Sequence, residues 1–138
     1  MYVDQIRDLT ESCNRHLFAE GDLAFKVGDY HVANERFALA SRGLSREANN
    51  RYAYFLRAAC VYCRLEEYEH ASQALLQALH NQQEMDTALE MNKLVNKLSN
   101  SLREDPQATE EQEGLSKELD RFVDQTMEGL ATRDHRAR

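Results

Sequence analysis

The fold is decided by the stretch LFAEGDLAFKVGDYHVANERFALA at residues 17–40, which returns in altered form as FLRAACVYCRLEEYEHASQALLQA at residues 55–78. Small residues where two helices cross let their backbones approach, while large residues fill the space around the crossing. We therefore expect two similar helical hairpins, with Gly21, Ala33, Ala59 and Ala71 at the crossings. Seven positions coincide at a constant offset of 38 residues: Leu17 with Phe55, Gly21 with Ala59, Ala24 with Tyr62, Tyr30 with Tyr68, Ala33 with Ala71, Phe37 with Leu75, and Ala40 with Ala78.

This pattern resembles the tetratricopeptide repeat (TPR) family, whose signature places large, small and aromatic residues on a first helix and A-x3-F on a second. Ala33-x3-Phe37 matches that motif directly, and the likeness covers about residues 15–81. The chain departs from the family in its offset of 38 residues, where the family uses about 34. It also lacks the closing proline, and Glu20 stands where a leucine is common.

The rest of the chain predicts further helices. Apolar residues between Ala88 and Leu102 recur at helical spacing and predict a fifth helix that caps the second hairpin. Residues 104–113 hold Pro106 and several acidic residues and are interpreted as a linker, 114–131 as an amphipathic helix, and 132–138 as a basic tail. The expected fold is all-α: TPR-like antiparallel hairpins at 1–103, stacked as a short right-handed solenoid with a capping helix and a C-terminal amphipathic helix.

Charge and composition narrow the class of partner. The net charge of −7 disfavours sequence-independent binding of nucleic acid, which depends on neutralising phosphates. No run approaches the roughly 18 apolar residues that a membrane-spanning helix needs, so we expect no membrane insertion and a cytoplasmic protein. Cys13, Cys60 and Cys63 are an odd and small number, which disfavours a disulfide framework.

The resemblance also implies where a partner would bind, because the first helix of each TPR hairpin lines the concave face of the stack. The alternative for each position is an ordinary solvated or packed side chain. A mixture of aromatic rings, thiols and cations suits a partly apolar ligand with some acidic character. The partner-binding residues implied on the first, third and fifth helices are Arg15, Phe18, Asp22, Phe25, Lys26, Leu56, Cys60, Cys63, Arg64, Lys93 and Lys97.

Metal binding and catalysis are both disfavoured by the spacing of the residues that they need. Cys13-x2-His16 and Cys60-x2-Cys63 suggest a zinc site, but in the expected register Cys13 lies about 13 Å along the helix from the level of Cys60. The histidines are scattered over separate elements, and the chain has no nucleophile elbow or glycine-rich phosphate loop. We therefore expect no metal, no cofactor and no enzymatic activity.

Three functions remain, and the first is favoured. It is an adaptor or scaffold that binds a peptide or helix of a partner protein in the concave groove. The second is a structural subunit that assembles with a larger complex or with itself, including as a homodimer through the C-terminal helix; docking of that helix on its own core is preferred over the dimer. The third is a co-chaperone, which is less favoured because Asp22 would repel the carboxylate that TPR clamps hold with lysine and asparagine.

Overall fold

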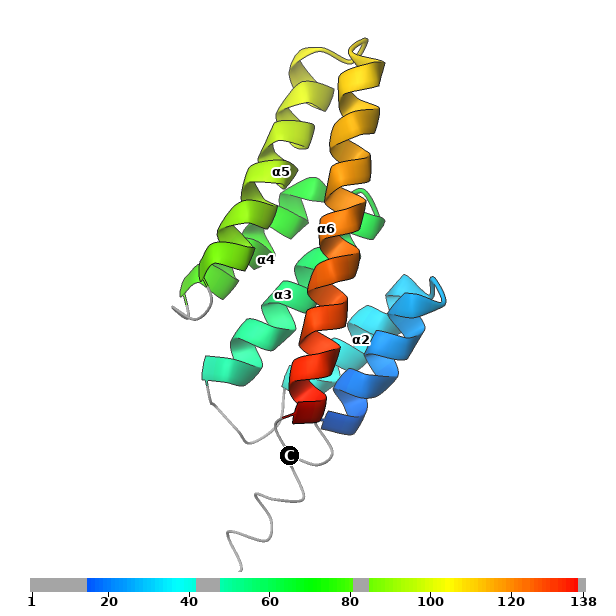
Figure 1. Ribbon diagram of the computed structural model, residues 1–138, viewed down its shortest axis with the longest axis vertical. Helices are drawn as coiled ribbons and strands as arrows, with labels where there is room; N and C mark the ends of the chain where they lie inside the picture. Colours follow the sequence, from blue (N-terminus) through cyan, green and yellow to red (C-terminus); the bar gives the residue numbers. More distant parts are fainter. Residues whose placement is uncertain (1–14, 42–47, 81–84, 137–138) are drawn as a thin grey trace, which may run out of the picture.

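The described part of the protein is entirely helical. The computed structural model (Figure 1) describes residues 15–41, 48–80 and 85–136, and no β-strand occurs in these ranges. The first helix is described over residues 15–26. The helices that follow it are α2 (Tyr30–Ser41), α3 (Ala48–Arg64), α4 (Tyr68–His80), α5 (Met85–Glu104) and α6 (Thr109–Arg136).

Helices that are consecutive in sequence pack side by side, from α2 on α3 through to α5 on α6. Helix α5 packs against α4: its residues Met91 and Val95 are fully buried, and the Ser72 hydroxyl of α4 donates to the Asn92 side-chain oxygen at 3.1 Å. The long helix α6 then turns back along α5 and crosses α3 toward the first helix (Figure 1). The C-terminal helix thus docks on its own chain, and Leu119, Val123 and Leu130 are buried there.

The turns of the two hairpins repeat one another at the offset of 38 residues. Gly28 and Glu66 both adopt positive φ, at 87° and 60°. In the first turn the amides of Gly28 and Asp29 donate to the carbonyls of Phe25 and Ala24 at 3.0 and 2.8 Å. The second turn has the equivalent bonds, from Glu66 to Cys63 at 3.2 Å and from Glu67 to Tyr62 at 2.9 Å. This pairing of hydrogen bonds is the Schellman motif, which ends a helix with a left-handed residue.

The four small residues expected at the helix crossings are all buried, as predicted. Ala33, Ala59 and Ala71 have no solvent-exposed surface. Gly21 is buried too, and a Cβ atom added to it would lie 2.4 Å from Cε1 of the Phe37 ring and 3.1 Å from the Ala33 carbonyl oxygen. The first helix and α2 therefore approach each other at a distance that only glycine allows at position 21.

The connection between α5 and α6 is shorter than the expected linker at 104–113. Helix α5 includes Glu104 and α6 begins at Thr109, so only residues 105–108 connect them. The acidic residues Glu110 and Glu111 lie in the first turn of α6, where negative charge stabilises the positive end of the helix dipole. The side-chain amide of Gln112 closes the turn by donating hydrogen bonds to the backbone carbonyls of Ser101 and Asp105, at 3.2 and 2.8 Å. The same helix extends to Arg136, beyond the expected end at residue 131.

The left-handed turn at Glu66 makes a prediction about stability. A side chain in this conformation costs about 1–2 kcal/mol, so Glu66→Gly should stabilise the protein by about 0.5–1 kcal/mol in urea unfolding. The control Glu67→Gly removes the same charge one residue later, where φ is not positive, and should not stabilise. Equal effects of the two variants would show that the gain came from charge.

The close approach at Gly21 makes a second prediction. Gly21→Ala should destabilise the protein by about 1–3 kcal/mol because the new methyl group overlaps the buried Phe37 ring. The control is Gly129→Ala on α6, where nothing lies within 4 Å of the added atom, so a gain of up to about 1 kcal/mol follows from helix propensity. Thermal unfolding of both variants measures the difference, and a neutral Gly21→Ala would contradict the close packing.

Candidate functional site

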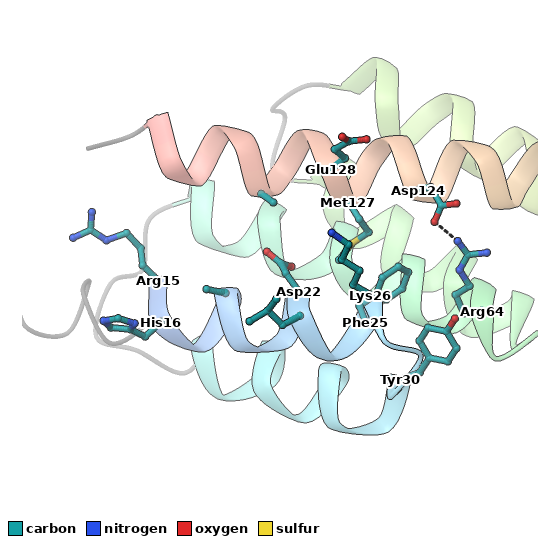
Figure 2. A pocket seen from close by; sticks show the side chains of 13 residues that line it. Arg15, His16, Asp22, Phe25, Lys26, Tyr30, Arg64, Asp124, Met127 and Glu128 are labelled. Atoms are coloured by element: carbon teal, nitrogen blue, oxygen red, sulfur yellow. Dashed lines mark hydrogen bonds and ion pairs between the residues drawn. The ribbon is translucent and has the colours of Figure 1, made fainter.

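A cavity of about 1060 Å³ lies between the first helix and α6, with the C-terminal end of α3 closing one side. Figure 2 shows its two walls, with Met127 reaching from α6 toward Lys26 and Phe25 of the first helix. Apolar and charged side chains alternate around it. The residues that line it are Arg15, His16, Ala19, Asp22, Leu23, Phe25, Lys26, Tyr30, Arg64, Asp124, Met127, Glu128 and Ala131.

Arg64 joins three elements at one end of this cavity. It lies at the C-terminal end of α3. Its guanidinium donates a hydrogen bond to the carboxylate of Asp120 in α6, at 2.7 Å, and another to the carboxylate of Asp124, one turn further along α6. The same guanidinium lies 5.7 Å from the centre of the Phe25 ring, which packs edge-on against Tyr30 at 5.3 Å. Burial lowers the pKa of Arg64, but the hydrogen bond and charge of Asp124 and the charge of Asp120 outweigh it and raise the pKa above its ordinary value. Arg64 therefore stays charged and holds α6 beside the first helix.

A second arginine, Arg57, lies beneath the cavity and is fully buried. Its Nε and Nη2 donate to the two carboxylate oxygens of Asp22 at 2.8 and 3.1 Å. The guanidinium also stacks over the rings of Phe18 and Phe37, at 4.5 and 5.7 Å from their centres. Asp22 thus serves as the counter-ion of a buried cation that ties the first hairpin to α3.

The structure brings together five of the eleven residues expected to bind a partner. Arg15, Asp22, Phe25, Lys26 and Arg64 all line the cavity. The other six do not line this cavity. Phe18, Leu56, Cys60 and Cys63 are buried in the core, and α6 packs over α3, whereas Lys93 and Lys97 are exposed on α5 and belong to no wall of the cavity.

The residues that the sequence did not indicate come from α6 and from the middle of α3. Asp124, Met127 and Glu128 form the second wall, and no sequence pattern specified that α6 would return to the first helix. Arg57 did have a signal: it is the single charge in the otherwise uncharged run YFLRAACVY at residues 54–62. A lone charge inside a buried helix requires a partner, and that requirement could have directed attention to Asp22.

The thiols of α3 are not activated. Burial raises the pKa of Cys63 to about 12, and burial together with the charge of Cys63 raises the pKa of Cys60 well above its ordinary value. Both thiols are free and protonated at neutral pH. In the described ranges no three His, Cys, Asp or Glu side chains gather as a metal ion would require, and Cys13 lies outside those ranges.

Comparison with known proteins adds no relative. No protein family, no curated protein and no solved structure matches the chain. Within the described residues, none of the helices is both long and apolar enough to cross a membrane. The site must therefore be interpreted from its own geometry and chemistry.

The Arg57–Asp22 pair makes a prediction that separates it from a surface ion pair. Asp22→Asn removes the negative charge that pairs with the buried Arg57 guanidinium and should destabilise the protein by roughly 3–5 kcal/mol. The control is Glu20→Gln on the same helix, which removes the ion pair of Glu20 with Arg36 at 3.3 Å, where both side chains are exposed. That change should cost less than about 1 kcal/mol in urea unfolding. Similar costs for the two variants would contradict the role assigned to the buried pair.

Proposed function

We propose that this protein is an adaptor that binds a helix or peptide of a partner protein in the cavity between the first helix and α6. The observation that supports it is an exposed apolar strip at the mouth of the cavity. Leu23 lines the cavity and is 67% exposed, and Val27, which directly follows the last residue of the same helix, is 80% exposed. Large apolar side chains left in water beside a cavity are typical of a binding surface.

The proposal includes a divergent TPR fold for the two hairpins. The repeated turn hydrogen bonds and the buried small residues at the crossings support this assignment. In a TPR stack the first helix of each hairpin faces the partner. Here α6 packs over α3, so the proposed binding site is restricted to the strip of concave face between the first helix and α6.

The chemistry of the lining favours binding over catalysis. Asp22 and Asp124 each accept hydrogen bonds from an arginine, so both carboxylates are already engaged. The nearby thiols are buried and protonated. A general base or a nucleophile would need a group that is free to take a proton or attack a substrate. Asp22, Asp124 and Arg64 instead hold neighbouring helices together.

The packing of α6 also bears on the alternative of self-assembly. The apolar stripe of α6 that could join two copies is buried against its own chain, including Leu119, Val123 and Leu130. A homodimer through this stripe would need α6 to leave α3 and break both ion pairs of Arg64. The adaptor is therefore preferred to the homodimer.

A single substitution tests the adaptor proposal without disturbing the core. Leu23→Asp places a charge in the exposed strip and should abolish capture of partner proteins from the source-cell lysate, measured by affinity purification and mass spectrometry. The control Leu76→Asp makes the same change on α4, where Leu76 is 56% exposed and does not line the cavity. Phe25 and Arg64 are unsuitable targets, because Phe25 is buried and Arg64 holds α6.

The outcome is read from the difference between the two variants. Proteins retained by the unchanged chain and by Leu76→Asp, but lost with Leu23→Asp, are the expected partners. An identical set of captured proteins for all three chains would contradict binding at this cavity. Circular dichroism of both variants checks that their helical content is unchanged.

A further inference from the structure

The lining of the cavity holds three positive and three negative side chains, in a chain whose net charge is −7, but these charges are not all paired with one another. Asp22 forms an ion pair with Arg57, and Asp124 forms an ion pair with Arg64. Glu128 is also already engaged in an interaction. In contrast, Arg15 and Lys26 have no ion-pair partner within the part of the chain that the structure describes. Among the described residues, these two cations are therefore the charged groups of the lining that remain to meet a ligand.

Arg15 and Lys26 lie on one face of the first helix. They are eleven residues apart in the sequence, which corresponds to about 16 Å along a helix. Ala19 and Leu23 line the cavity between them, at the intervening positions of the same helical face. Figure 2 shows Arg15 at one end of the first helix and Lys26 further along it, near Met127 of α6. The wall thus offers a cation, an apolar centre and a second cation.

From this arrangement we infer that the partner of the proposed function is an acidic amphipathic helix. It would place a carboxylate near each cation, about three turns apart, and small apolar side chains between them against Ala19, Leu23 and Met127. A helix fits because the exposed Leu23 and Val27 are spaced by four residues and because both walls of the cavity are helices, the arrangement in which an amphipathic helix packs into a groove. This inference rests on the proposed function and adds the chemistry of the ligand.

The net negative charge of the chain determines how this attraction acts. Charges further apart than about 8 Å are screened at physiological salt. An acidic helix is therefore not drawn to the molecule from a distance and is attracted only where Arg15 and Lys26 are close. The two cations act in selecting the ligand more than in speeding its arrival, since a neutral or basic helix would leave them without a counter-ion.

The test is a selection from a phage library of random 16-residue peptides on the immobilised full-length chain. Selected peptides are synthesised with a fluorescent label, and their affinities are measured by anisotropy. Arg15→Glu with Lys26→Glu reverses both cavity charges. Lys93→Glu with Lys97→Glu is the matched control, since it changes the net charge equally on α5, away from the cavity. Leu23→Asp is measured in parallel.

Peptides rich in Asp and Glu that become helical on binding are the expected result. Arg15→Glu with Lys26→Glu should weaken the affinity for these peptides by about tenfold or more. The control pair of substitutions on α5 should weaken it by less than about twofold. The opposing results are distinct. Selected peptides that need Leu23 but are neutral or basic, or that the charge-reversed chain binds equally well, would overturn the acidic helix and leave the proposed function standing. Peptides that bind Leu23→Asp without loss would overturn both.

Two checks keep the result interpretable. Arg15 and Lys26 are exposed, so reversing them should leave the circular dichroism unchanged, and the two single substitutions provide a milder test if the double variant does not fold. Light scattering of the full-length chain tests whether a second copy of the chain occupies the cavity. Concentration-dependent dimers that exclude the peptides and disappear with Leu23→Asp would contradict the inference.

Discussion

The arrangement of the two hairpins depends on the ion pair between Arg57 and Asp22. A guanidinium without any solvent-exposed surface is tolerated only where a counter-ion lies at the right distance and angle. Asp22 of the first helix is this counter-ion, and its carboxylate accepts two hydrogen bonds from Arg57 of α3. Apolar packing alone is weakly directional, so alanine-lined crossings would permit the hairpins to slide. The buried pair fixes one register between them, and the stacked rings of Phe18 and Phe37 shield it from water.

The sequence predicted the hairpins well because their signals are local. The recurrence of small and aromatic residues at the offset of 38 is a property of adjacent helices, and the turns at Gly28 and Glu66 confirm it down to equivalent hydrogen bonds. The linker at 104–113 was placed less well. Its acidic residues have no apolar period, and without the helix that follows they are indistinguishable from a solvated connection, whereas Glu110 and Glu111 stabilise the start of α6.

The site was predicted on one wall only. The first helix contributes Arg15, Asp22, Phe25 and Lys26 to the lining of the cavity, since its helical periodicity determines which residues share a face. The path of α6 could not be derived, because an amphipathic helix can dock on any apolar surface of sufficient length. That path depends on long-range contacts, above all between Arg64 and two carboxylates that follow it by 56 and 60 residues. Helix α6 also packs over α3, the helix on which Leu56, Cys60 and Cys63 are buried.

Arg64 has a consequence for the energetics of binding. It touches Phe25 in one wall of the cavity and holds α6, the other wall, through Asp120 and Asp124. The position of α6 and the occupancy of the cavity are therefore thermodynamically linked. Any molecule that binds more tightly when α6 is seated must stabilise the seated helix by the same factor. A modification of α6 that weakens its attachment would consequently adjust the affinity of a site that the modified residue never contacts.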